Sequence, residues 1–415
     1  MTDDVRAGKP RVVLGVGGGI AAYKSASLLR LLTESGHDVT VVPTRAALEF
    51  VGAATWAALS GHPVNTDLWT GAHEVPHVRI GQHADLVIVA PATADLLAKA
   101  AHGLADDLLT NTLLTARCPV VFAPAMHTEM WEHPATQANV GTLRSRGALV
   151  IEPAAGRLTG ADTGPGRLPE PEEIFEVCRR ILARGVAGLV PDLVGHRVLV
   201  TAGGTREPLD PVRFVGNRAS GRQGYALART AVTRGAEVVL VAANTELADP
   251  AGVKVVPVTT TAQLRDAVLA EAAVADAIVM AAAIADFRPE TYHDKKIKKV
   301  DDSWAPTVQL VQNPHVLREL TAHRVRTGQI IVGFAAETGD ADRNAIEVGR
   351  DKLGRYGVDL LVVNEVGTDK AFGSPDNEAV IFDAAGGQTV VGYGPKEALA
   401  DRIWDLVVAA LARSP

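Results

Sequence analysis

The chain has 415 residues, a formal net charge of −7, 47% hydrophobic residues and two cysteines. This length predicts two domains, because single hydrophobic cores stop growing at about 250–300 residues. The negative charge argues against a general nucleic-acid or membrane-surface binder, and two cysteines are too few for a disulfide-rich secreted protein. The charged N-terminus lacks a signal peptide and no apolar run reaches the roughly 20 residues of a membrane span, so we expect a cytoplasmic α/β protein.

The first elements form a βαβ unit with a glycine-rich turn. The pattern predicts a strand, a helix and a second strand over residues 12–16, 20–34 and 39–42. The turn reads GVGGGI, which is not the dinucleotide fingerprint GxGxxG, and no acidic residue ends the second strand. Thr44 follows that strand instead. This favours a ligand with one phosphate, such as FMN, over the ribose of NAD.

Two further strands share one design, DLVIVAPATAD at residues 85–95 and DAIVMAAAIAD at residues 276–286. Each ends in small residues and then an Asp that we expect near a helix start. Small residues let a ligand approach the backbone at the carboxyl end of a strand, where open α/β sheets bind their ligands. The rest of the first half predicts a helix, a strand and a helix over 106–115, 120–122 and 170–182.

A glycine-rich stretch separates the two halves. We expect a first domain at 1–185, a linker at 186–195 and a second domain at 196–415. The second half repeats the α/β pattern, with strands expected at 197–200, 237–241, 277–280, 330–334 and 359–363. A terminal hairpin over 380–382 and 389–391 and a closing helix over 395–411 complete it.

The second domain begins with the stretch VLVTAGGTREPLDPVRFVGNRASGRQG, residues 198–224. A strand runs into a glycine turn, and Ser220 and Gly221 then open a helix. Such a helix start presents backbone N–H groups and a positive dipole end to an anion. The loop between them carries more donors than a connection needs: Arg206, Arg213, Asn217 and Arg218. We therefore expect a phosphate or carboxylate site.

A basic run, Lys295, Lys296, Lys298 and Lys299, follows the strand that ends near Asp286. By itself such a run is more often a solvated loop, but its position favours a clamp for a triphosphate. His77 precedes the strand at 85 and could carry a proton near a flavin, although spacing alone does not single it out. The other histidines show no metal-ligand spacing.

These residues resemble, nearly end to end, the bifunctional phosphopantothenoylcysteine decarboxylase/phosphopantothenate–cysteine ligases of coenzyme A synthesis. The first half resembles flavodoxin-like, flavin-containing Cys decarboxylases in GVGGGIAAYK, APATADLLAKAAHGLADDL, APAMHTEMW and GPGRL. The second half resembles the ligase in residues 198–224, AAAIADF, KKIKK, NP and GFAAET. The resemblance implies two Rossmann-like three-layer α/β domains.

For the second half the resemblance implies that CTP activates 4′-phosphopantothenate as an acyl-cytidylate, which cysteine then attacks. Mg²⁺ should bridge the phosphates. Arg213 and Asn217 match residues that hold phosphopantothenate, and Lys296 matches one that stabilises charge at the α-phosphate. The remaining substrate contacts fall on Ala282, Ala283, Asp286, Asn313, Phe334 and Lys352. The family often has a second lysine where this chain has Tyr356, which leaves that nucleotide contact open.

For the first half the resemblance implies FMN-dependent oxidation and decarboxylation of the cysteine moiety, followed by reduction to 4′-phosphopantetheine. His77 matches the family's catalytic histidine. The FMN positions are Gly17, Gly18, Gly19, Thr44, Ala92, Thr93 and Met126. Two departures stand out: His127 replaces a substrate-binding Asn, and Gly160 replaces the flap cysteine.

Three hypotheses follow, of which the bifunctional enzyme is the one we adopt. The second is an active ligase with a flavin-binding, regulatory first domain that has lost decarboxylation, as the missing flap cysteine would allow. The third, an NAD(P)-dependent reductase, is disfavoured by the absent GxGxxG. The resemblance also implies a homo-oligomer with trimer-forming flavin domains and dimer-forming ligase domains, up to a dodecamer.

Overall fold

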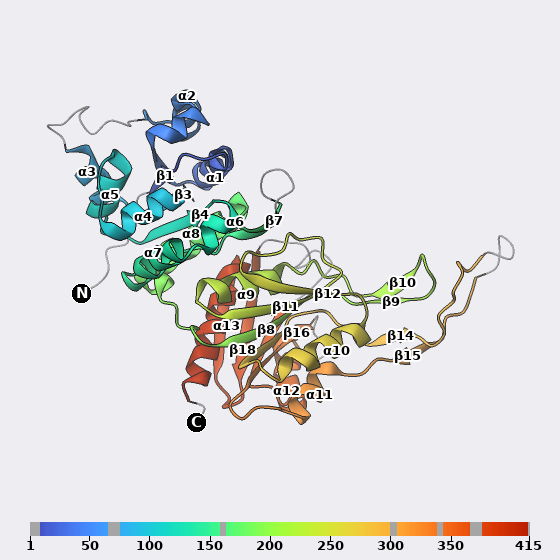
Figure 1. Cartoon of the computed structure of the whole chain (residues 1–415). Helices are drawn as coiled ribbons and strands as arrows, with labels where there is room; N and C mark the ends of the chain where they lie inside the picture. The colour runs from blue at the N-terminus through green and yellow to red at the C-terminus, as the bar shows by residue number, and fades with distance from the viewer. Residues whose placement is uncertain are drawn as a thin grey trace. The chain divides into compact units, whose positions relative to one another are not determined.

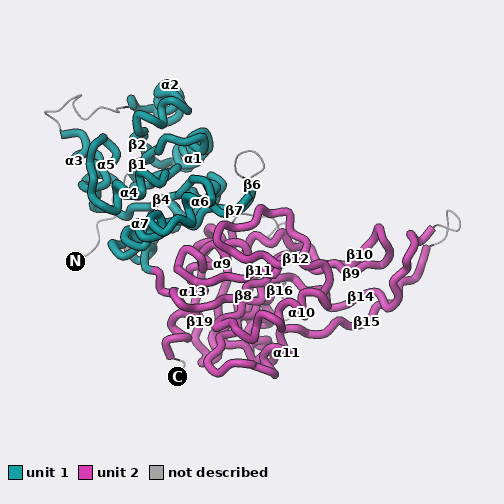
Figure 2. Tube along the Cα trace, viewed as in Figure 1, with its two compact units in different colours: residues 1–190 teal, residues 191–415 magenta. Residues whose placement is uncertain are grey.

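The computed structural model describes residues 9–64, 75–157, 163–298, 305–337, 343–365 and 376–413. The chain divides into two compact units, residues 1–190 and 191–415 (Figure 2). None of the helices in the described part is both long and apolar enough to cross a bilayer. The flap at residues 159–162 and Lys299 lie outside the described residues.

Unit 1 is built on a five-stranded parallel sheet in the order β2-β1-β3-β4-β5 (Figure 1). This is the flavodoxin-like order, in which the chain changes direction across the sheet between β1 and β3. The expected fold of the first domain is therefore confirmed. The strands are β1 (Arg11–Val16), β2 (Asp38–Pro43), β3 (Leu86–Ala92), β4 (Val120–Pro124) and β5 (Leu149–Val150).

Helices cover both faces of this sheet because successive strand residues point to opposite sides. Leu14 packs with α1 and α8 on one face, while Val13 packs with α4, α5 and α7 on the other. The Thr93 hydroxyl caps α4, which ends at Gly103 with φ of 69°. The helices are α1 (Ala22–Glu34), η1 (Arg45–Glu49), α2 (Ala53–Ser60), α3 (Pro76–His83), α4 (Ala94–His102), α5 (Leu108–Thr115), α6 (Thr128–Glu132), α7 (Pro134–Ser145), α8 (Pro171–Arg184) and η3 (Gly185–Leu189).

Unit 2 is built on an eight-stranded mixed sheet in the order β12-β11-β8-β13-β16-β17-β18-β19. The first six strands are parallel in the Rossmann order, and β18 and β19 add an antiparallel hairpin. The strands are β8 (Arg197–Gly203), β11 (Glu237–Ala243), β12 (Val253–Val258), β13 (Ala277–Met280), β16 (Ile330–Glu337), β17 (Leu360–Glu365), β18 (Asp376–Asp383) and β19 (Gln388–Pro395).

The core of unit 2 also lies on both sides of its sheet. Val198 and Val200 pack against α9 and α13, and Leu199 packs against α10 and α11. A capping box between Thr260 and Gln263 starts α10. The helices are α9 (Arg222–Thr233), α10 (Thr261–Ala272), α11 (Val316–Ala322), α12 (Ala345–Tyr356) and α13 (Lys396–Leu411).

Short antiparallel strand pairs extend from both units. In unit 1, β6 (Ala154–Arg157) pairs with β7 (Thr163–Arg167). In unit 2, β9 (Arg206–Pro208) pairs with β10 (Phe214–Gly216), and β14 (Phe287–Pro289) pairs with β15 (Leu310–Gln312). Figure 1 shows these last four strands projecting from the sheet of unit 2. We call the described residues 206–216, 287–298 and 305–312 the arm.

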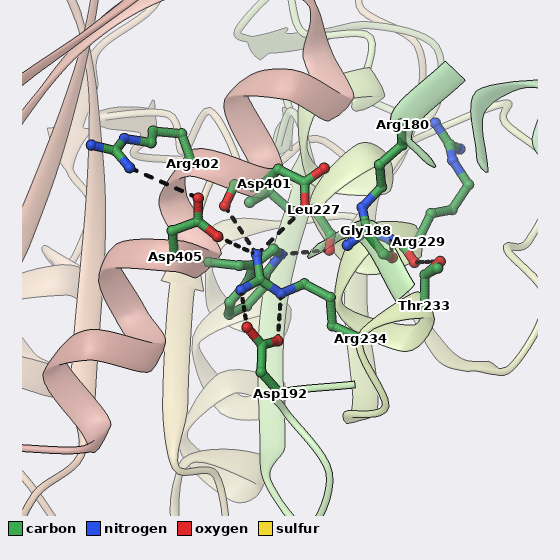
Figure 3. A network of polar contacts seen from close by, with 11 residues as sticks. Arg180, Gly188, Asp192, Leu227, Arg229, Thr233, Arg234, Asp401, Arg402 and Asp405 are labelled. Atoms are coloured by element: carbon green, nitrogen blue, oxygen red, sulfur yellow. Dashed lines mark hydrogen bonds and ion pairs between the residues drawn. The ribbon is translucent and has the colours of Figure 1, made fainter. Parts of the chain in front are cut away.

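A buried arginine joins the start of unit 2 to its last helix (Figure 3). Arg234 is 1% exposed and contacts Asp192, Asp401 and Asp405, with N···O distances of 2.5, 3.4 and 2.9 Å. Burial opposes its charge, but the hydrogen bond to Asp192 and the three carboxylate charges raise its pKa. Leu193 is fully buried beside this network. The stretch expected as a linker thus contributes to the packing of unit 2.

Two local expectations differ from the structure. Asp95 lies in the first turn of α4 as expected, but Asp286 precedes β14 and not a helix. The reason is that Phe287–Pro289 pairs with β15, and Pro289 favours extended backbone at the residue before it. The edge strand β12 is missing from the elements expected above, because Pro257 interrupts its apolar pattern; an edge strand tolerates a proline.

Candidate active sites

The first candidate site is a cavity of about 1100 Å³ at the carboxyl ends of the strands of unit 1. Gly18 and Gly19 follow β1, Thr44 follows β2 and Thr93 follows β3, and all four line it. Residues 125–127, after β4, complete this wall. The position is the switch point where doubly wound sheets bind ligands.

Glycine is required in the turn after β1 because the backbone is closely approached. A Cβ on Gly17 would lie 2.5 Å from the Pro91 carbonyl oxygen, and one on Gly18 would lie 2.4 Å from the Ala46 Cβ. The Gly17 amide donates to that Pro91 oxygen, and Ala92 is fully buried. Gly17 and Ala92 therefore shape the cavity from behind and do not line it.

Two hydroxyl groups face this cavity from helix starts. The Thr44 oxygen accepts a hydrogen bond from the Ala47 amide at 3.2 Å, and the Thr93 oxygen accepts one from Leu96 at 3.3 Å. Each hydroxyl keeps its own proton for donation to a ligand oxygen. The glycine turn, the two hydroxyl groups and the size of the cavity together fit a phosphate-bearing ligand such as a flavin mononucleotide.

Three cations that the sequence motifs did not single out also line this cavity: Lys24, Lys99 and Arg167. Lys24 and Arg167 both contact Glu170, at 3.0 and 2.8 Å. Lys99 contacts Asp106, whose hydrogen bond is the largest cause that raises the Lys99 pKa. The motifs GVGGGIAAYK, GPGRL and ADLLAKAAHG contain these three cations, so the signal was present but was not assigned to them.

Met126 and His127 line the cavity, whereas His77 does not. His127 occupies the N-cap position of α6, and the Met126 amide donates to Gly166 at 2.9 Å. His77 lies in the first turn of α3, and its Nδ1 is buried without a hydrogen-bond partner among the described residues. Within one chain, the candidate base is thus separate from the cavity.

The second candidate site is a cavity of about 400 Å³ in unit 2, at the carboxyl ends of β8, β13 and β16. The start of α9, with Gly221 as its N-cap residue, forms one side. The lining includes these predicted residues: Asn217, Ala282, Ala283, Asp286, Asn313, Phe334, Lys352 and Tyr356. The tertiary structure therefore brings together eight positions that span residues 217–356.

Internal hydrogen bonds hold several of these side chains in place. Asn217 donates to the Ile284 carbonyl at 2.9 Å, and Asn313, 8% exposed, donates to the Ala285 carbonyl at 2.9 Å. The amides of Ala282 and Ala283 donate to the Thr201 hydroxyl and the Gly203 carbonyl. These two N–H groups are already used, which limits the backbone contact we expected from them.

One wall of the unit 2 cavity is aromatic. The rings of His315 and Tyr356 lie 5.1 Å apart, Arg318 lies over Tyr356, and Phe334 also lines the cavity. Burial, followed by the charge of Arg318, lowers the pKa of His315, so its ring is neutral at pH 7. Nearby, Lys352 forms an ion pair with Glu337. Flat apolar faces beside fixed charges suit a nucleobase.

Arg213 and Lys296 lie on the arm and do not line either cavity. Asp210 organises this part of the arm: it accepts hydrogen bonds from the amides of Val212, Arg213 and Ile297. Burial opposes its charge, but these bonds and Arg213 lower its pKa. Arg213 also donates to the Ile297 carbonyl at 3.0 Å, while Lys296 is exposed. No group of three potential metal ligands occurs among the described residues.

Comparisons with known proteins cover both units. Residues 2–182 match the flavoprotein family, and residues 193–411 match the DNA/pantothenate metabolism flavoprotein C-terminal domain. The chain is 58% identical to the Coenzyme A biosynthesis bifunctional protein CoaBC of Mycolicibacterium smegmatis, over 97% of this chain and 98% of the relative. The relative of the same name in Vibrio cholerae is 42% identical, over 97% of this chain and 98% of the relative.

Among solved structures, the C-terminal domain of a Coenzyme A biosynthesis bifunctional protein CoaBC is 31% identical. The match covers 54% of this chain and 98% of that domain, with a TM-score of 0.45.

Proposed function

The chain belongs to the bifunctional CoaBC family of coenzyme A biosynthesis, in which a ligase and a decarboxylase share one chain, and from this premise we propose its two reactions. Unit 2 joins 4′-phosphopantothenate to cysteine at the expense of CTP, and unit 1 decarboxylates the product with FMN. The observation that carries the proposal is the gathering of seven family-matched residues, together with Tyr356, around one cavity of unit 2.

In the ligase reaction, a carboxylate oxygen of phosphopantothenate attacks the α-phosphorus of CTP. The bond from that phosphorus to the bridging oxygen breaks, and pyrophosphate leaves. The cysteine amine then attacks the acyl carbon, loses a proton and releases CMP. Phe334 and Tyr356 hold the base, Lys352 and Asp286 line the nucleotide site, and Asn217 orients phosphopantothenate.

Mg²⁺ would neutralise phosphate charge in this proposal, with few ligands from the protein. Among the described residues no three carboxylates, histidines or cysteines converge, and Mg²⁺ usually keeps waters and takes one or two carboxylates plus substrate phosphates. Asp286 lines the cavity and is the carboxylate that we assign to it.

In the decarboxylase reaction, FMN would supply the redox chemistry when it is bound in the unit 1 cavity. Gly18, Gly19, Thr44 and Thr93, which line that cavity, would hold its phosphate. His77 removes the proton from the substrate, and His127 supplies one at the end.

Two of the predicted site residues outside the cavities, Lys296 and His77, support a homo-oligomer. Lys296 is exposed on the arm, away from the cavity of its own chain, so we propose that the arm of a second copy supplies it. Large apolar side chains are exposed along the arm, as at a protein interface: Val212, Phe214, Val215, Phe287, Tyr292 and Leu310. We likewise propose that His77 reaches a neighbouring flavin domain in a trimer, and that trimers and dimers together build a dodecamer.

The test is to incubate the protein with 4′-phosphopantothenate, CTP, Mg²⁺ and cysteine and to identify the products by mass. We expect pyrophosphate, CMP, CO₂ and 4′-phosphopantetheine, and a yellow protein that releases FMN. Accumulation of phosphopantothenoylcysteine with FMN bound would instead support the regulatory first domain. Absence of CTP consumption would refute the ligase assignment.

A further inference from the structure

A buried lysine lines the unit 2 cavity at a position to which neither the motifs nor the proposed function assigns a role. Lys396 is the first residue of α13 and is 6% exposed. Among the residues that the structure describes, its ammonium donates to one acceptor, the Asp376 carbonyl, at 2.9 Å. An ammonium has three N–H donors, so this bond leaves donors for a ligand in the cavity.

No carboxylate forms an ion pair with this ammonium within the described part of the chain. Burial lowers the pKa of Lys396, and the more distant charges of Asp376 and Glu397 offset this only in part. The carboxylate of Glu397 is already engaged by Arg229 at 2.7 Å. Burial of a cation without a paired anion is costly unless a ligand supplies the anion.

The surrounding side chains hold Lys396 in this position. Asn377 donates to Gln223 at 3.1 Å, and Gln223 donates to the Lys396 carbonyl at 3.2 Å. Both amides also line the cavity. The register of β18 against β19 shifts between Asn377 and Ala379, an irregularity of the kind often found beside active sites.

Two further sources of positive potential meet Lys396 at this end of the cavity. Helix α9 packs beside α13 (Figure 1), and its start has Gly221 as N-cap without a side-chain cap. Its first amides are therefore available to an anion. Arg222, in the same turn, also lines the cavity, and its charge contributes to lowering the pKa of Lys396.

We infer that Lys396 binds the terminal phosphates of the nucleotide and stabilises pyrophosphate as it leaves. This inference rests on the proposed CTP-dependent ligase reaction. When the bond between the α-phosphorus and the bridging oxygen breaks, the electron pair leaves with pyrophosphate, so negative charge grows on that group. Two cations and a helix start match such a multiply charged anion better than they match the single carboxylate of cysteine.

The experiment compares Lys396→Gln with wild type in the full chain, by calorimetric titration with inorganic pyrophosphate and, separately, with CMP. CMP lacks the terminal phosphates, so a general disturbance of the cavity would weaken both ligands. We expect pyrophosphate binding to weaken roughly 10- to 100-fold and CMP binding to stay within about three-fold. The matched control is Lys254→Gln, whose exposed ammonium contacts Glu271 away from the cavity and should change neither affinity.

Steady-state kinetics separate the two possible anions. Lys396→Gln should reduce ligase turnover and leave the KM for cysteine unchanged, and Lys396→Arg should restore most of the turnover. A raised KM for cysteine with unchanged pyrophosphate binding would overturn the inference in favour of the cysteine carboxylate. Equal losses for pyrophosphate and CMP would also overturn it, since they indicate a structural role.

A second measurement uses the unmodified protein in case the variants do not fold. Pyrophosphate, but not CMP, should protect Lys396 from reductive methylation, as read by peptide mass mapping; equal labelling with either ligand would contradict the inference. Wild-type CTP consumption is measured in parallel. If the wild type does not consume CTP, the proposed ligase reaction fails, whereas normal consumption with unchanged Lys396→Gln kinetics refutes only the role of Lys396.

Discussion

At the scale of single residues, His77 is the candidate base, and it does not line the cavity of its own chain. It lies in the first turn of α3, with Nδ1 buried and without a partner in the described structure, and outside the lining of the unit 1 cavity. A buried, unpartnered ring nitrogen is costly in a purely structural residue. Its geometry is thus compatible with a proton carrier that acts on a substrate bound by another copy.

We predict that His77→Asn abolishes decarboxylation and leaves FMN binding and ligase turnover intact. Removal of a general base commonly lowers the rate by roughly 10²- to 10⁴-fold. The measurement is CO₂ release from phosphopantothenoylcysteine, with the flavin spectrum as a check on binding. His83→Asn, at the exposed end of the same helix, is the control and should retain full activity. Near-normal CO₂ release by His77→Asn would remove this residue from the mechanism.

The chain has Gly160 at the position of the family's flap cysteine, and its two thiols are poor replacements for that cysteine. Cys178 is fully buried in α8, and burial raises its pKa to about 12. Burial also raises the pKa of Cys118, which lies just before β4, at the opposite end of that strand from His127. Both thiols therefore stay protonated and away from the cavity of their own chain.

We predict that the double variant Cys118→Ser/Cys178→Ser still forms 4′-phosphopantetheine, because the closing proton comes from His127, Asp162 or water. The assay compares this variant with His127→Asn, and product is identified by mass. We expect His127→Asn to be the slower of the two in the reductive step. A thiol-free enzyme that releases CO₂ but stops at an oxidised product would show that a cysteine closes the cycle.

At the scale of elements, the arm carries residues that the sheet cannot supply. Arg213 lies just before β10, and Lys296 lies in the segment that follows β14; Asp210 accepts hydrogen bonds from the amides of Arg213 and Ile297. Neither residue lines a cavity of its own chain, which is why we propose that each acts on a ligand bound by a second copy. An isologous dimer would place each arm at the partner's cavity.

We predict that Lys296→Gln nearly abolishes CTP-dependent turnover while CTP binding weakens much less, since its charge acts on the transition state. Mixing this arm variant with the cavity variant Phe334→Ala should restore activity at about a quarter of the sites, because half the dimers are mixed and each has one intact site. Activity is measured after the two proteins have exchanged subunits. Absence of any recovery would place Lys296 in the site of its own chain, and lower CTP affinity with normal maximal turnover would make it a ground-state contact.

The Arg234 network joins three separate elements: the start of unit 2, the end of α9 and α13. We predict that Arg234→Met lowers the free energy of unfolding of unit 2 by about 3–5 kcal/mol, because Asp192, Asp401 and Asp405 would lose the buried cation that contacts all three. The measurement is the calorimetric transition of unit 2 in the full chain. Arg402→Gln removes an exposed cation from Asp405 and should cost less than about 1 kcal/mol; similar losses in both variants would contradict this account.

At the scale of the whole molecule, the two large sheets each have a core on both faces. Among the described strands, none from one unit pairs with the sheet of the other. A unit with its own two-sided core has what it needs to fold alone. The segment before β8 is part of unit 2, because Leu193 is buried there and Asp192 contacts Arg234.

We predict that residues 190–415 alone form phosphopantothenoylcysteine from CTP without FMN, and that residues 1–190 bind FMN. A fragment that starts at residue 196 should be less stable by several kcal/mol, because it lacks the buried Leu193 and the Asp192 partner of Arg234. Thermal unfolding compares the two ligase fragments, and product mass measures activity. Failure of both 190–415 and 1–190 to fold would refute independent domains and leave the activities open.

The sequence by itself determined the two sheets and most of the cavity walls. Periodic apolar strands, glycine turns and hydroxyl caps are local signals, and their strand order follows the few topologies that doubly wound sheets adopt. Local patterns and motifs are thus enough to locate several candidate site positions: the turn after β1, Thr44, Thr93, Asn217 and Asn313. Lys24, Lys99 and Arg167 stood in the same motifs, but nothing local tells which charged residue of a helix faces a ligand.

Only the tertiary structure decided which residues meet and which do not. Lys396 reaches the unit 2 cavity because β18, β19 and α13 return beside α9, a contact between residues more than 170 positions apart. His77, Arg213 and Lys296 stand apart from the cavities of their own chain for the same reason, since distance along the chain does not set distance in space. Local propensity selects elements, whereas long-range packing selects the partners of each side chain.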